Sequence, residues 1–225
     1  GADLIDLGGA SSHPKAAPVT VKDELARIAP VVERLVAEVP LPLSIDTQQP
    51  EVAEECLRLG AHLINDVSGL TDLAMAHVAA RWDVPLVVMY NNLTVPKESP
   101  ALSTVSDMLA FFSDRVADCE AAGVRRLILD PGYGFGKTLP ESLTVLQNLH
   151  LLQRFNRPIL VCTSRKGSLG VLGQEPEPKR RLGATLASSL YALSQGATLV
   201  RVHDVKDWVQ AQRTWLALSG FPGEV

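Results

Sequence analysis

Asp130 occupies a position typical of a group that binds or reacts with a ligand. It follows a short run of leucine and isoleucine at 127–129, and three glycines turn the chain before a helical pattern begins at Leu139. An apolar run of this length, closed by turn residues, is typical of a strand buried on both faces. In parallel α/β folds, catalytic and ligand-binding groups lie at the carboxyl ends of such strands. The sequence therefore places a carboxylate where a polar ligand would bind.

The glycines after Asp130 do not form a known nucleotide-binding motif. A P-loop requires a glycine five residues before the Gly136-Lys137 pair, and Pro131 stands there instead. The dinucleotide motif G-x-G-x-x-G fails as well, because its third glycine would fall on Lys137 or Leu139. We therefore interpret this stretch as a turn from strand to helix beside a ligand.

Polar side chains with comparable chemistry follow other apolar runs along the chain. Each has a carboxylate, amide, amine, guanidinium or imidazole group, and each stands at or just past a predicted strand end: Asp46, Asn65, Lys166, Arg201 and His203. Because the carboxyl ends of parallel strands share one edge of a sheet, these groups are expected to face a common ligand.

Bulk composition excludes several classes of protein. The net charge is −4 and the pI about 5.7, which gives no reason to expect a nucleic-acid or anionic-membrane partner. No apolar run reaches the length of a membrane span, and the start lacks signal-peptide features. Cys56, Cys119 and Cys162 are widely spaced and odd in number, which suits neither a disulfide framework nor a zinc site. We expect a cytoplasmic protein.

The elements that must position these groups alternate along the 225 residues. Strands are predicted at 4–7, 43–47, 63–69 (running into a loop), 86–90, 127–130, 159–162 and 199–203. Helices are predicted after the capping residue Thr20, from Pro50 to Gly60, and at 74–80, 106–122, 141–155, 179–194 and 206–218.

Strict alternation predicts right-handed βαβ units and a parallel sheet. Polar groups follow nearly every strand, which favours a (β/α)₈ TIM barrel over an open sheet with one switch point. We expect one barrel domain over 1–225. Seven strands are one too few for a closed barrel, and we expect that the first βα unit is lacking or truncated.

At this level of detail the chain resembles the dihydropteroate synthase family. The resemblance rests on six motifs in the family's order, spread over the whole chain: 8–14 (GGASSHP), 44–47 (SIDT), 65–69 (NDVSG), 130–137 (DPGYGFGK), 164–166 (SRK) and 201–204 (RVHD). It implies a transferase of folate biosynthesis that joins 6-hydroxymethyl-7,8-dihydropterin pyrophosphate to p-aminobenzoate. The expected products are 7,8-dihydropteroate and pyrophosphate. The resemblance also implies assistance by Mg²⁺, inhibition by sulfonamides and a homodimer.

The family's functional residues carry over to matching positions here. The resemblance assigns pterin binding to Asp46, Asn65, Asp130, Phe135, Lys166 and Arg201, and pyrophosphate binding to Ser12, His13, Arg201 and His203. Lys166, Arg201, His203 and Asp46 are the expected catalytic residues. A carboxylate such as Asp130 matches the paired donors of a pterin ring, and a guanidinium can lie on the ring and meet phosphate with its edge.

Each of these residues also has a plainer interpretation. In this interpretation Asp46 and Asp130 are solvated carboxylates at strand ends, and Lys166 is a surface residue. Asn65 and Asp66 then only cap a loop. Arg201 and His203, which alternation predicts on the same side of a strand, otherwise have a structural role.

Other residues are expected to be structural. The histidines His62, His77 and His150 lack metal spacing, Cys162 is expected to be a small buried thiol, and Trp208 with Trp215 forms a packing face.

Departures from the family pattern keep other functions open. The motif with the family's metal-contacting Asn has no counterpart, so the metal ligands are unknown. Ala10 replaces a Glu, His13 replaces an Arg, Tyr90-Asn91 replaces a His-containing pair, and Gly167-Ser168 follows Lys166. The alternatives are a catalytically inactive pterin-binding paralogue and an enzyme resembling methyltetrahydrofolate-corrinoid methyltransferases.

Overall fold

The computed structural model describes residues 1–11, 16–91 and 103–220. Two compact units make up the chain. The first contains residues 2–91 and 108–129, and the second contains residue 1 together with 92–107 and 130–225.

A parallel sheet forms the centre of the first unit. Its strand order follows the chain, and its strands are β1 (Ile5–Gly8), β2 (Leu43–Asp46), β3 (Leu63–Asp66), β4 (Leu86–Met89) and β5 (Leu127–Asp130). In register, Gly8 pairs with Asp46, and Asp46 with Asn65. A sequential order contains no switch point, which is the arrangement of barrel strands rather than of a doubly wound sheet. The predicted α/β alternation with a parallel sheet is confirmed.

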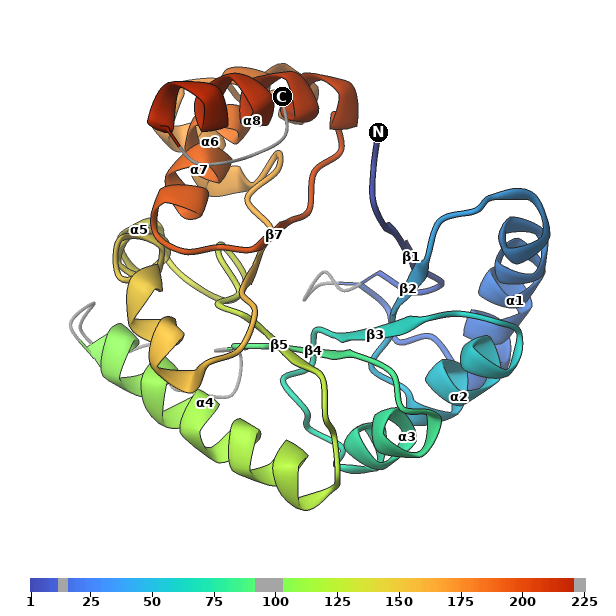
Figure 1. Ribbon diagram of the computed structural model, residues 1–225. Helices are drawn as coiled ribbons and strands as arrows, with labels where there is room; N and C mark the ends of the chain where they lie inside the picture. The colour runs from blue at the N-terminus through green and yellow to red at the C-terminus, as the bar shows by residue number, and fades with distance from the viewer. Residues whose placement is uncertain (12–15, 92–102, 221–225) are drawn as a thin grey trace. The chain divides into compact units, whose positions relative to one another are not determined.

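Helices cover the sheet of the first unit on one face. They are α1 (Val21–Glu38), α2 (Pro50–Arg58), α3 (Ala74–Trp82) and α4 (Ser103–Ala121), the last of which begins before residue 108. Figure 1 shows α1, α2 and α3 side by side along β1 to β4. As predicted, Thr20 caps α1 by accepting a hydrogen bond from the N–H of Asp23 at 3.1 Å, and Pro50 opens α2.

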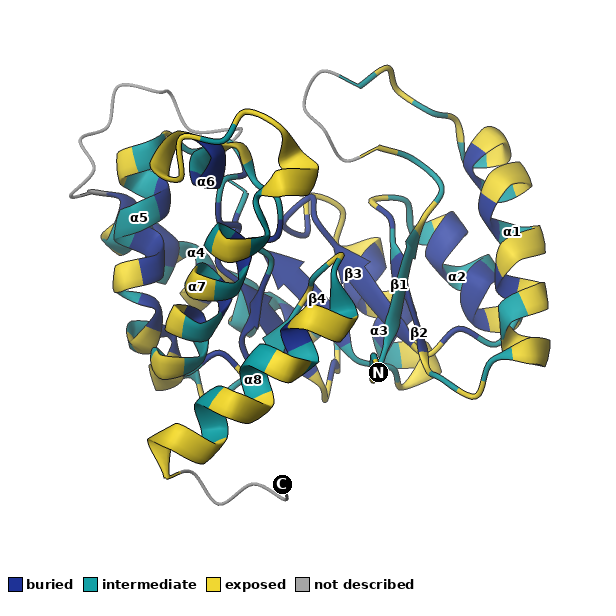
Figure 2. Ribbon diagram, turned by 90° about the horizontal axis from the view of Figure 1, so that it is seen from above, coloured by how far each residue is buried: buried dark blue, intermediate teal, exposed yellow. Residues whose placement is uncertain are grey.

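The core of the first unit lies between these helices and the strands. Figure 2 shows buried residues along β2 and β3 and on the helix faces that meet them, with exposed residues on the outer faces. Val32 of α1, Ile45 of β2 and Val52 of α2 are fully buried. Burying side chains of this size stabilises the fold by about 1.5–3 kcal/mol each relative to exposure.

The second unit contains two short parallel strands and most of the remaining helices. Its elements are α5 (Leu139–Gln147), η1 (Leu149–Phe155), β6 (Leu160–Val161), α6 (Gly167–Leu172), η2 (Pro178–Arg180), α7 (Leu182–Ser194), β7 (Leu199–Val200) and α8 (Val205–Ser219). Strand β6 pairs with β7, so that Leu160 faces Leu199.

Three sequence predictions for the second unit were wrong in detail, and one helix was missed. The helix predicted at 179–194 is divided at Arg181 into η2 and α7. The helix predicted at 141–155 is interrupted at Asn148, whose side chain donates to the carbonyl of Thr144 at 2.8 Å and so competes with the helical backbone. Helix α6 was missed because its two glycines lower helix propensity. The strand predicted at 199–203 ends at Val200.

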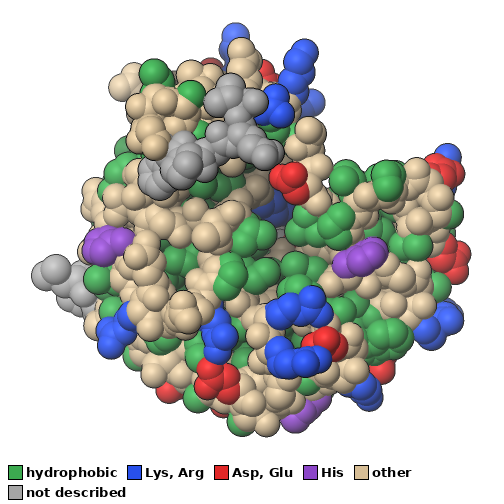
Figure 3. Space-filling model, in the orientation of Figure 1, with side chains coloured by type: hydrophobic (Ala, Val, Ile, Leu, Met, Phe, Trp, Pro, Cys, Tyr) green, Lys and Arg blue, Asp and Glu red, His purple; other side chains and the backbone are tan. Residues whose placement is uncertain are grey.

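Charged side chains of both signs are scattered over the molecular face drawn in Figure 3, with no large patch of a single sign. Among the described residues, no helix is both long enough and apolar enough to cross a bilayer.

Candidate active site

The Asp130 carboxylate is held by hydrogen bonds to both of its oxygens. The N–H of Gly132 donates to Oδ1 at 2.7 Å, and the Cys162 thiol donates to Oδ2 at 3.4 Å. Gly132 has a φ of 63°, a conformation that glycine adopts without strain. Burial raises the pKa of Asp130, while the Gly132 bond and the positive charge of Lys166 oppose that rise. A carboxylate that is costly to ionise in the free protein is suited to a ligand that brings its own donors.

Lys137 fixes the turn that follows Asp130. Its Nζ donates to the carbonyl oxygens of Gly132 at 3.1 Å and of Phe135 at 3.2 Å. Burial lowers the pKa of Lys137 to about 7, against the opposing influence of the Asp130 carboxylate. The amine therefore stabilises the turn as a hydrogen-bond donor.

Lys166 and Phe135 lie against each other beside this turn. The Lys166 ammonium lies 5.7 Å from the centre of the Phe135 ring, within the range of a cation–π interaction. A Cβ at Gly134 would lie 3.5 Å from Cδ of Lys166, so glycine leaves room for the lysine stem. Lys166 is the residue that precedes α6, and the turn thus directs its amine toward the Asp130 side of the second unit.

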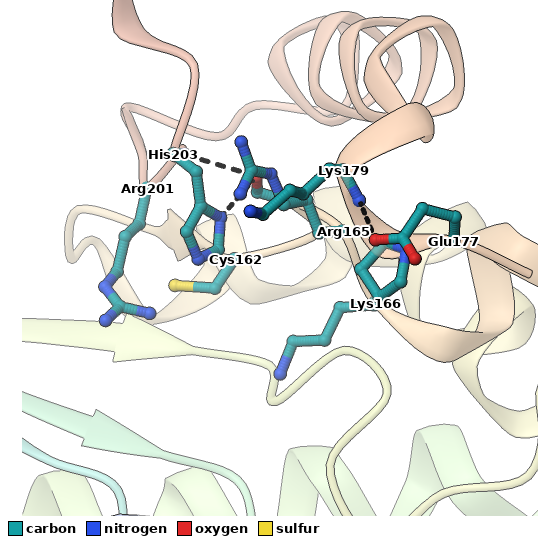
Figure 4. A pocket seen from close by; sticks show the side chains of 9 residues that line it. Cys162, Arg165, Lys166, Glu177, Lys179, Arg201 and His203 are labelled. Carbon is teal, nitrogen blue, oxygen red and sulfur yellow. Dashed lines mark hydrogen bonds between the residues drawn. The ribbon is translucent and has the colours of Figure 1, made fainter.

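Lys166 also lines a cavity of about 490 Å³, and Figure 4 shows the side chains around it. Its size is typical of a small-molecule site. Four basic side chains and one carboxylate belong to its lining, which comprises Cys162, Ser164, Arg165, Lys166, Glu177, Pro178, Lys179, Arg201 and His203. A cavity with this excess of positive charge is suited to a polyanionic ligand.

His203 is linked to Ser164 by two hydrogen bonds. Nδ1 of His203 lies 2.8 Å from Oγ of Ser164, and the backbone N–H of His203 donates to the same oxygen at 3.2 Å. Since Oγ already accepts from the backbone, its own proton is available to Nδ1. Desolvation and the nearby Arg165 and Arg201 lower the pKa of His203, which favours the neutral ring. We infer a neutral His203 with its proton on Nε2, where it can be donated to a phosphate oxygen.

Arg165 and Arg181 hold the loop between β6 and α6. Arg165 has a φ of 59°, and its guanidinium forms a bidentate ion pair with Asp204, 2.6 Å at the shorter contact. Arg181 donates to the carbonyls of Arg165 at 2.9 Å and Lys166 at 3.3 Å. It also donates to those of Glu175 and Pro176.

Gly170 of α6 is what makes room for Arg181. A Cβ at Gly170 would lie 2.6 Å from the guanidinium carbon of Arg181. The loop that carries Lys166 is thus fixed by Arg181, which lies between η2 and α7, and by Asp204, which precedes α8.

Asn65 and Asp46 belong to the first unit. Nδ2 of Asn65 lies 3.4 Å from each carboxylate oxygen of Asp6, and Ser44 donates to Asp6 at 2.6 Å. The Oδ1 atom of Asn65 is buried and has no hydrogen-bond partner among the described residues. A buried acceptor in this state costs about 1–3 kcal/mol, and a ligand donor would offset that cost. Asp46 is half-buried at the end of β2, next to Asn65 in the sheet register.

The comparisons with known proteins identify the family. A model of the family described as "Pterin binding enzyme" matches residues 1–203. The dihydropteroate synthase of Escherichia coli K12 is 40% identical over 218 residues, covering 95% of this chain and 77% of that protein. The chain belongs to the dihydropteroate synthase family. It is a pterin-binding enzyme, a transferase of folate biosynthesis, as the sequence motifs predicted.

Solved structures of this family have the same fold. The dihydropteroate synthase of Xanthomonas albilineans with 4-aminobenzoic acid is 40% identical, has a TM-score of 0.93 and covers 99% of this chain and 81% of that one. The same organism's enzyme in complex with 7,8-dihydropteroate is 38% identical, with a TM-score of 0.89 over 99% of this chain and 83% of that one. The α/β fold with its parallel sheet therefore matches that of dihydropteroate synthase barrels.

The structure brings together part of the predicted dihydropteroate synthase site. Lys166, Arg201 and His203 line one cavity, although the strand that was predicted to present the last two ends before them. Asp130 and Phe135 adjoin Lys166 in the same unit. Ser12 and His13 lie outside the described residues. Asp66 accepts hydrogen bonds from the N–H groups of Ser68 and Leu70, so its carboxylate serves the loop.

Sequence reasoning missed the residues that orient the family's known groups. Ser164 was quoted within a motif but given no role, and a hydroxyl two residues before the lysine was the available signal. Asp6 carried a weaker signal, as a carboxylate inside an apolar strand. Arg181, Glu177 and Lys179 had none, because only the folded chain brings them to the loop or to the cavity.

Mg²⁺ is expected for this family, but the described residues provide a poor site for a resident ion. Mg²⁺ takes hard oxygen ligands, usually one or two carboxylates together with substrate phosphates and water. The cavity lining offers the single carboxylate of Glu177 among basic side chains. Among the described residues, no three His, Cys, Asp or Glu side chains form a cluster that could hold a metal. We therefore derive no chemical step through a metal.

Proposed function

We propose that this enzyme condenses 6-hydroxymethyl-7,8-dihydropterin pyrophosphate with p-aminobenzoate, giving 7,8-dihydropteroate and pyrophosphate. The observation that carries the proposal is the position of Lys166. Its amine lies 5.7 Å from the centre of the Phe135 ring in the turn after Asp130, and Lys166 also lines a cavity together with Arg201 and His203. A pterin with a diphosphate tail has parts that complement both groups: its flat ring has the donors and acceptors that suit Asp130 and Lys166, and its diphosphate is the polyanion that suits the basic cavity.

The pterin ring is bound by the carboxylate, amide and amine groups. Asp130 accepts from the exocyclic amino group and the adjacent ring N–H, a charge-assisted pair. Asn65 and Asp46 bind the remaining ring nitrogens. The Oδ1 atom of Asn65, which has no hydrogen-bond partner in the described ranges, supports its part in this role. Lys166 donates to the ring carbonyl, Arg201 lies on the ring face, and Phe135 shapes the wall beside Lys166.

The diphosphate is bound by Arg201, His203, Ser12 and His13. Pyrophosphate leaves first with the electron pair of the C–O bond, which gives a cationic methylene on the pterin, and the aniline nitrogen then attacks and loses a proton. Arg201 and the Nε2 proton of His203 stabilise the charge that develops on the phosphate oxygens. Asp46 and Asp130 favour the cation electrostatically.

No side-chain nucleophile takes part in the proposed reaction. Cys162 is the thiol nearest the site, and desolvation together with the Asp130 carboxylate raises its pKa well above the usual range. A thiol must be deprotonated to attack carbon, so Cys162 is unsuited to that role. Its donation to Asp130 instead gives it a structural part in pterin binding.

The remaining expectations concern the setting of the reaction. We propose one (β/α)₈ barrel domain over residues 1–225, in a family whose reaction sulfonamides block. The homodimer and the use of Mg²⁺ rest on family resemblance alone. A reducing cytoplasm fits the three free cysteines, and no nucleic-acid or membrane partner is expected.

The decisive experiment measures pyrophosphate release together with binding. The protein is titrated calorimetrically with the pterin pyrophosphate and then with p-aminobenzoate, with and without Mg²⁺, and pyrophosphate release is followed with both substrates. Binding of both with release is the expected result. Pterin binding alone would identify an inactive paralogue, and binding of a methylated folate instead would identify a methyltransferase-like enzyme.

A further inference from the structure

Lys179 lies in the cavity although no motif of the family contains it. It belongs to η2, a three-residue 3₁₀ helix between α6 and α7, and it lines the same cavity as Arg201 and His203. Its neighbour Arg180 has the same charge, belongs to the same short helix and is also exposed, but does not line the cavity. The two positions therefore differ in what they face.

Within the described part of the chain, the ammonium of Lys179 forms no ion pair with the carboxylate of Glu177. Glu177 caps η2, and its Oε1 accepts from the backbone N–H of Lys179 at 3.4 Å. Figure 4 shows the Lys179 side chain extending away from Glu177, toward the part of the cavity that contains Arg165 and His203. Arg165 is already in a bidentate ion pair with Asp204, so the positive charge of Lys179 is the more available of the two.

Lys179 and Lys166 occupy different ends of the cavity. The Lys166 amine points to the Phe135 ring and the turn after β5, where the pterin ring is proposed to bind. Lys179 extends toward His203, one of the residues that are proposed to bind the diphosphate. A cation on an exposed short helix keeps its conformational freedom and can follow a phosphate as it departs.

We propose that Lys179 binds the terminal phosphate of the substrate's diphosphate, and of the pyrophosphate product, as a further specificity-determining residue of this site. The inference rests on the function proposed above. It assigns the outer end of the cavity to the distal phosphate and makes Glu177 a carboxylate that weakens anion binding there. Lys179 and Glu177 thus set the affinity for pyrophosphate in opposite directions.

The test compares three variants in their binding of inorganic pyrophosphate and of the pterin pyrophosphate. Lys179→Ala is expected to weaken both affinities about three- to ten-fold at low salt, in line with one solvent-exposed charge contact. The matched control Arg180→Ala removes the same charge from the same helix and is expected to change them by less than about two-fold. Glu177→Gln is expected to strengthen binding by about two- to five-fold.

Further measurements separate this inference from the proposed function. The difference in pyrophosphate affinity between Lys179→Ala and Arg180→Ala should become smaller as the salt concentration is raised. All three variants should keep the wild-type melting temperature and the wild-type affinity for a pterin that carries no phosphate. Equal effects of the two alanine variants, or weaker binding by Glu177→Gln, would overturn the role of Lys179 while leaving the enzyme's function intact. A wild-type protein that binds neither pyrophosphate nor its pterin ester would overturn both.

Discussion

The side-chain amide of Asn65 on β3 is oriented by the carboxylate of Asp6 on β1, whose two oxygens each lie 3.4 Å from its Nδ2 atom. The contact reaches across β2, where Ser44 donates to the same carboxylate. Because Nδ2 is thereby engaged, the acceptor Oδ1 is the atom left for a ligand. The orientation of this amide is thus determined by the protein before any pterin arrives.

Substituting Asp6→Asn should weaken pterin binding about five-fold, with little change in pyrophosphate binding. An amide at this position is uncharged, and its NH₂ group replaces one of the two acceptor oxygens that lie 3.4 Å from Nδ2 of Asn65. A lost hydrogen bond of this kind is worth about 1 kcal/mol. Calorimetric titration with the pterin would measure the effect. Asp3→Asn, at an exposed position in the same segment, is the control. A parallel loss of pyrophosphate affinity would point to a general structural defect instead.

Asp130→Asn should abolish most pterin binding without destabilising the protein. Loss of a charge-assisted, bidentate contact is expected to weaken binding by about 30- to 100-fold. The pKa of Asp130 is raised in the folded protein, so the folded state binds more protons than the unfolded one above pH about 4. Its ionisation then lowers stability as pH rises, and the neutral amide avoids that cost.

Thermal unfolding at pH 7 would test the second half of this prediction. The Asp130→Asn variant should melt at the wild-type temperature or above it. Unchanged pterin affinity would contradict the proposed role of the carboxylate, and a large fall in melting temperature would show that Asp130 is mainly structural.

Ser164→Ala should release the His203 ring and weaken pyrophosphate binding by about five-fold. The hydroxyl is the group that holds Nδ1 as an acceptor and leaves the proton on Nε2. Nitrogen chemical shifts of the labelled imidazole would report the tautomer directly. Ser194→Ala on α7, where the hydroxyl bonds only a backbone carbonyl of its own helix, should leave both readouts unchanged.

Pyrophosphate affinity should rise as pH falls from 8 toward 6. Desolvation and the charges of Arg165, Arg201 and Lys166 lower the pKa of His203, against the opposing charge of Asp204. A bound polyanion raises that pKa again, so binding takes up a proton. In the free protein the unfolded state binds more protons just below pH about 6.5, so His203 makes stability rise with pH there.

Titration in buffers of different ionisation enthalpy would count the proton that is taken up. His203→Gln should remove the uptake and flatten the pH dependence. Persistence of the full pH dependence in that variant would assign the proton to another group.

Arg181→Met should lower the free energy of unfolding by about 2–3 kcal/mol, because a charged donor leaves several backbone carbonyls without their partner. The pterin affinity should fall as well, since Lys166 stands on the loop that Arg181 holds. Arg180→Met at the adjacent exposed position should change stability by less than about 0.5 kcal/mol. Urea unfolding of the two variants would measure the difference, and equal values would refute this role of Arg181.

Local features of the sequence predicted most of the fold. Thr20 and Pro50 marked helix starts because capping and the missing proline N–H depend on neighbouring residues alone. Asp130 was identified because a carboxylate after a buried apolar run is visible in one window of sequence. The same windows predicted the parallel alternation that the sheet order confirms.

The remaining features depend on contacts between distant residues. Asp6 reaches Asn65 across 59 residues, and His203 reaches Ser164 across 39. Helix α6 was missed because its glycines argue against a helix, and only the fold shows that Gly170 makes room for Arg181. Such pairs leave no periodic pattern in the sequence, so sequence analysis finds the binding groups more readily than the residues that orient them.

Because Gly170 and Arg181 lie so close together, the substitutions tolerated at one position in laboratory evolution depend on the residue at the other. An alanine at 170 would displace the guanidinium from the loop carbonyls, because its Cβ would occupy the same space. Once the arginine has been replaced by a smaller residue, the three atoms nearest to that Cβ are gone, and the same alanine improves the propensity of the helix. The order in which two such mutations arise therefore decides whether the intermediate enzyme survives selection.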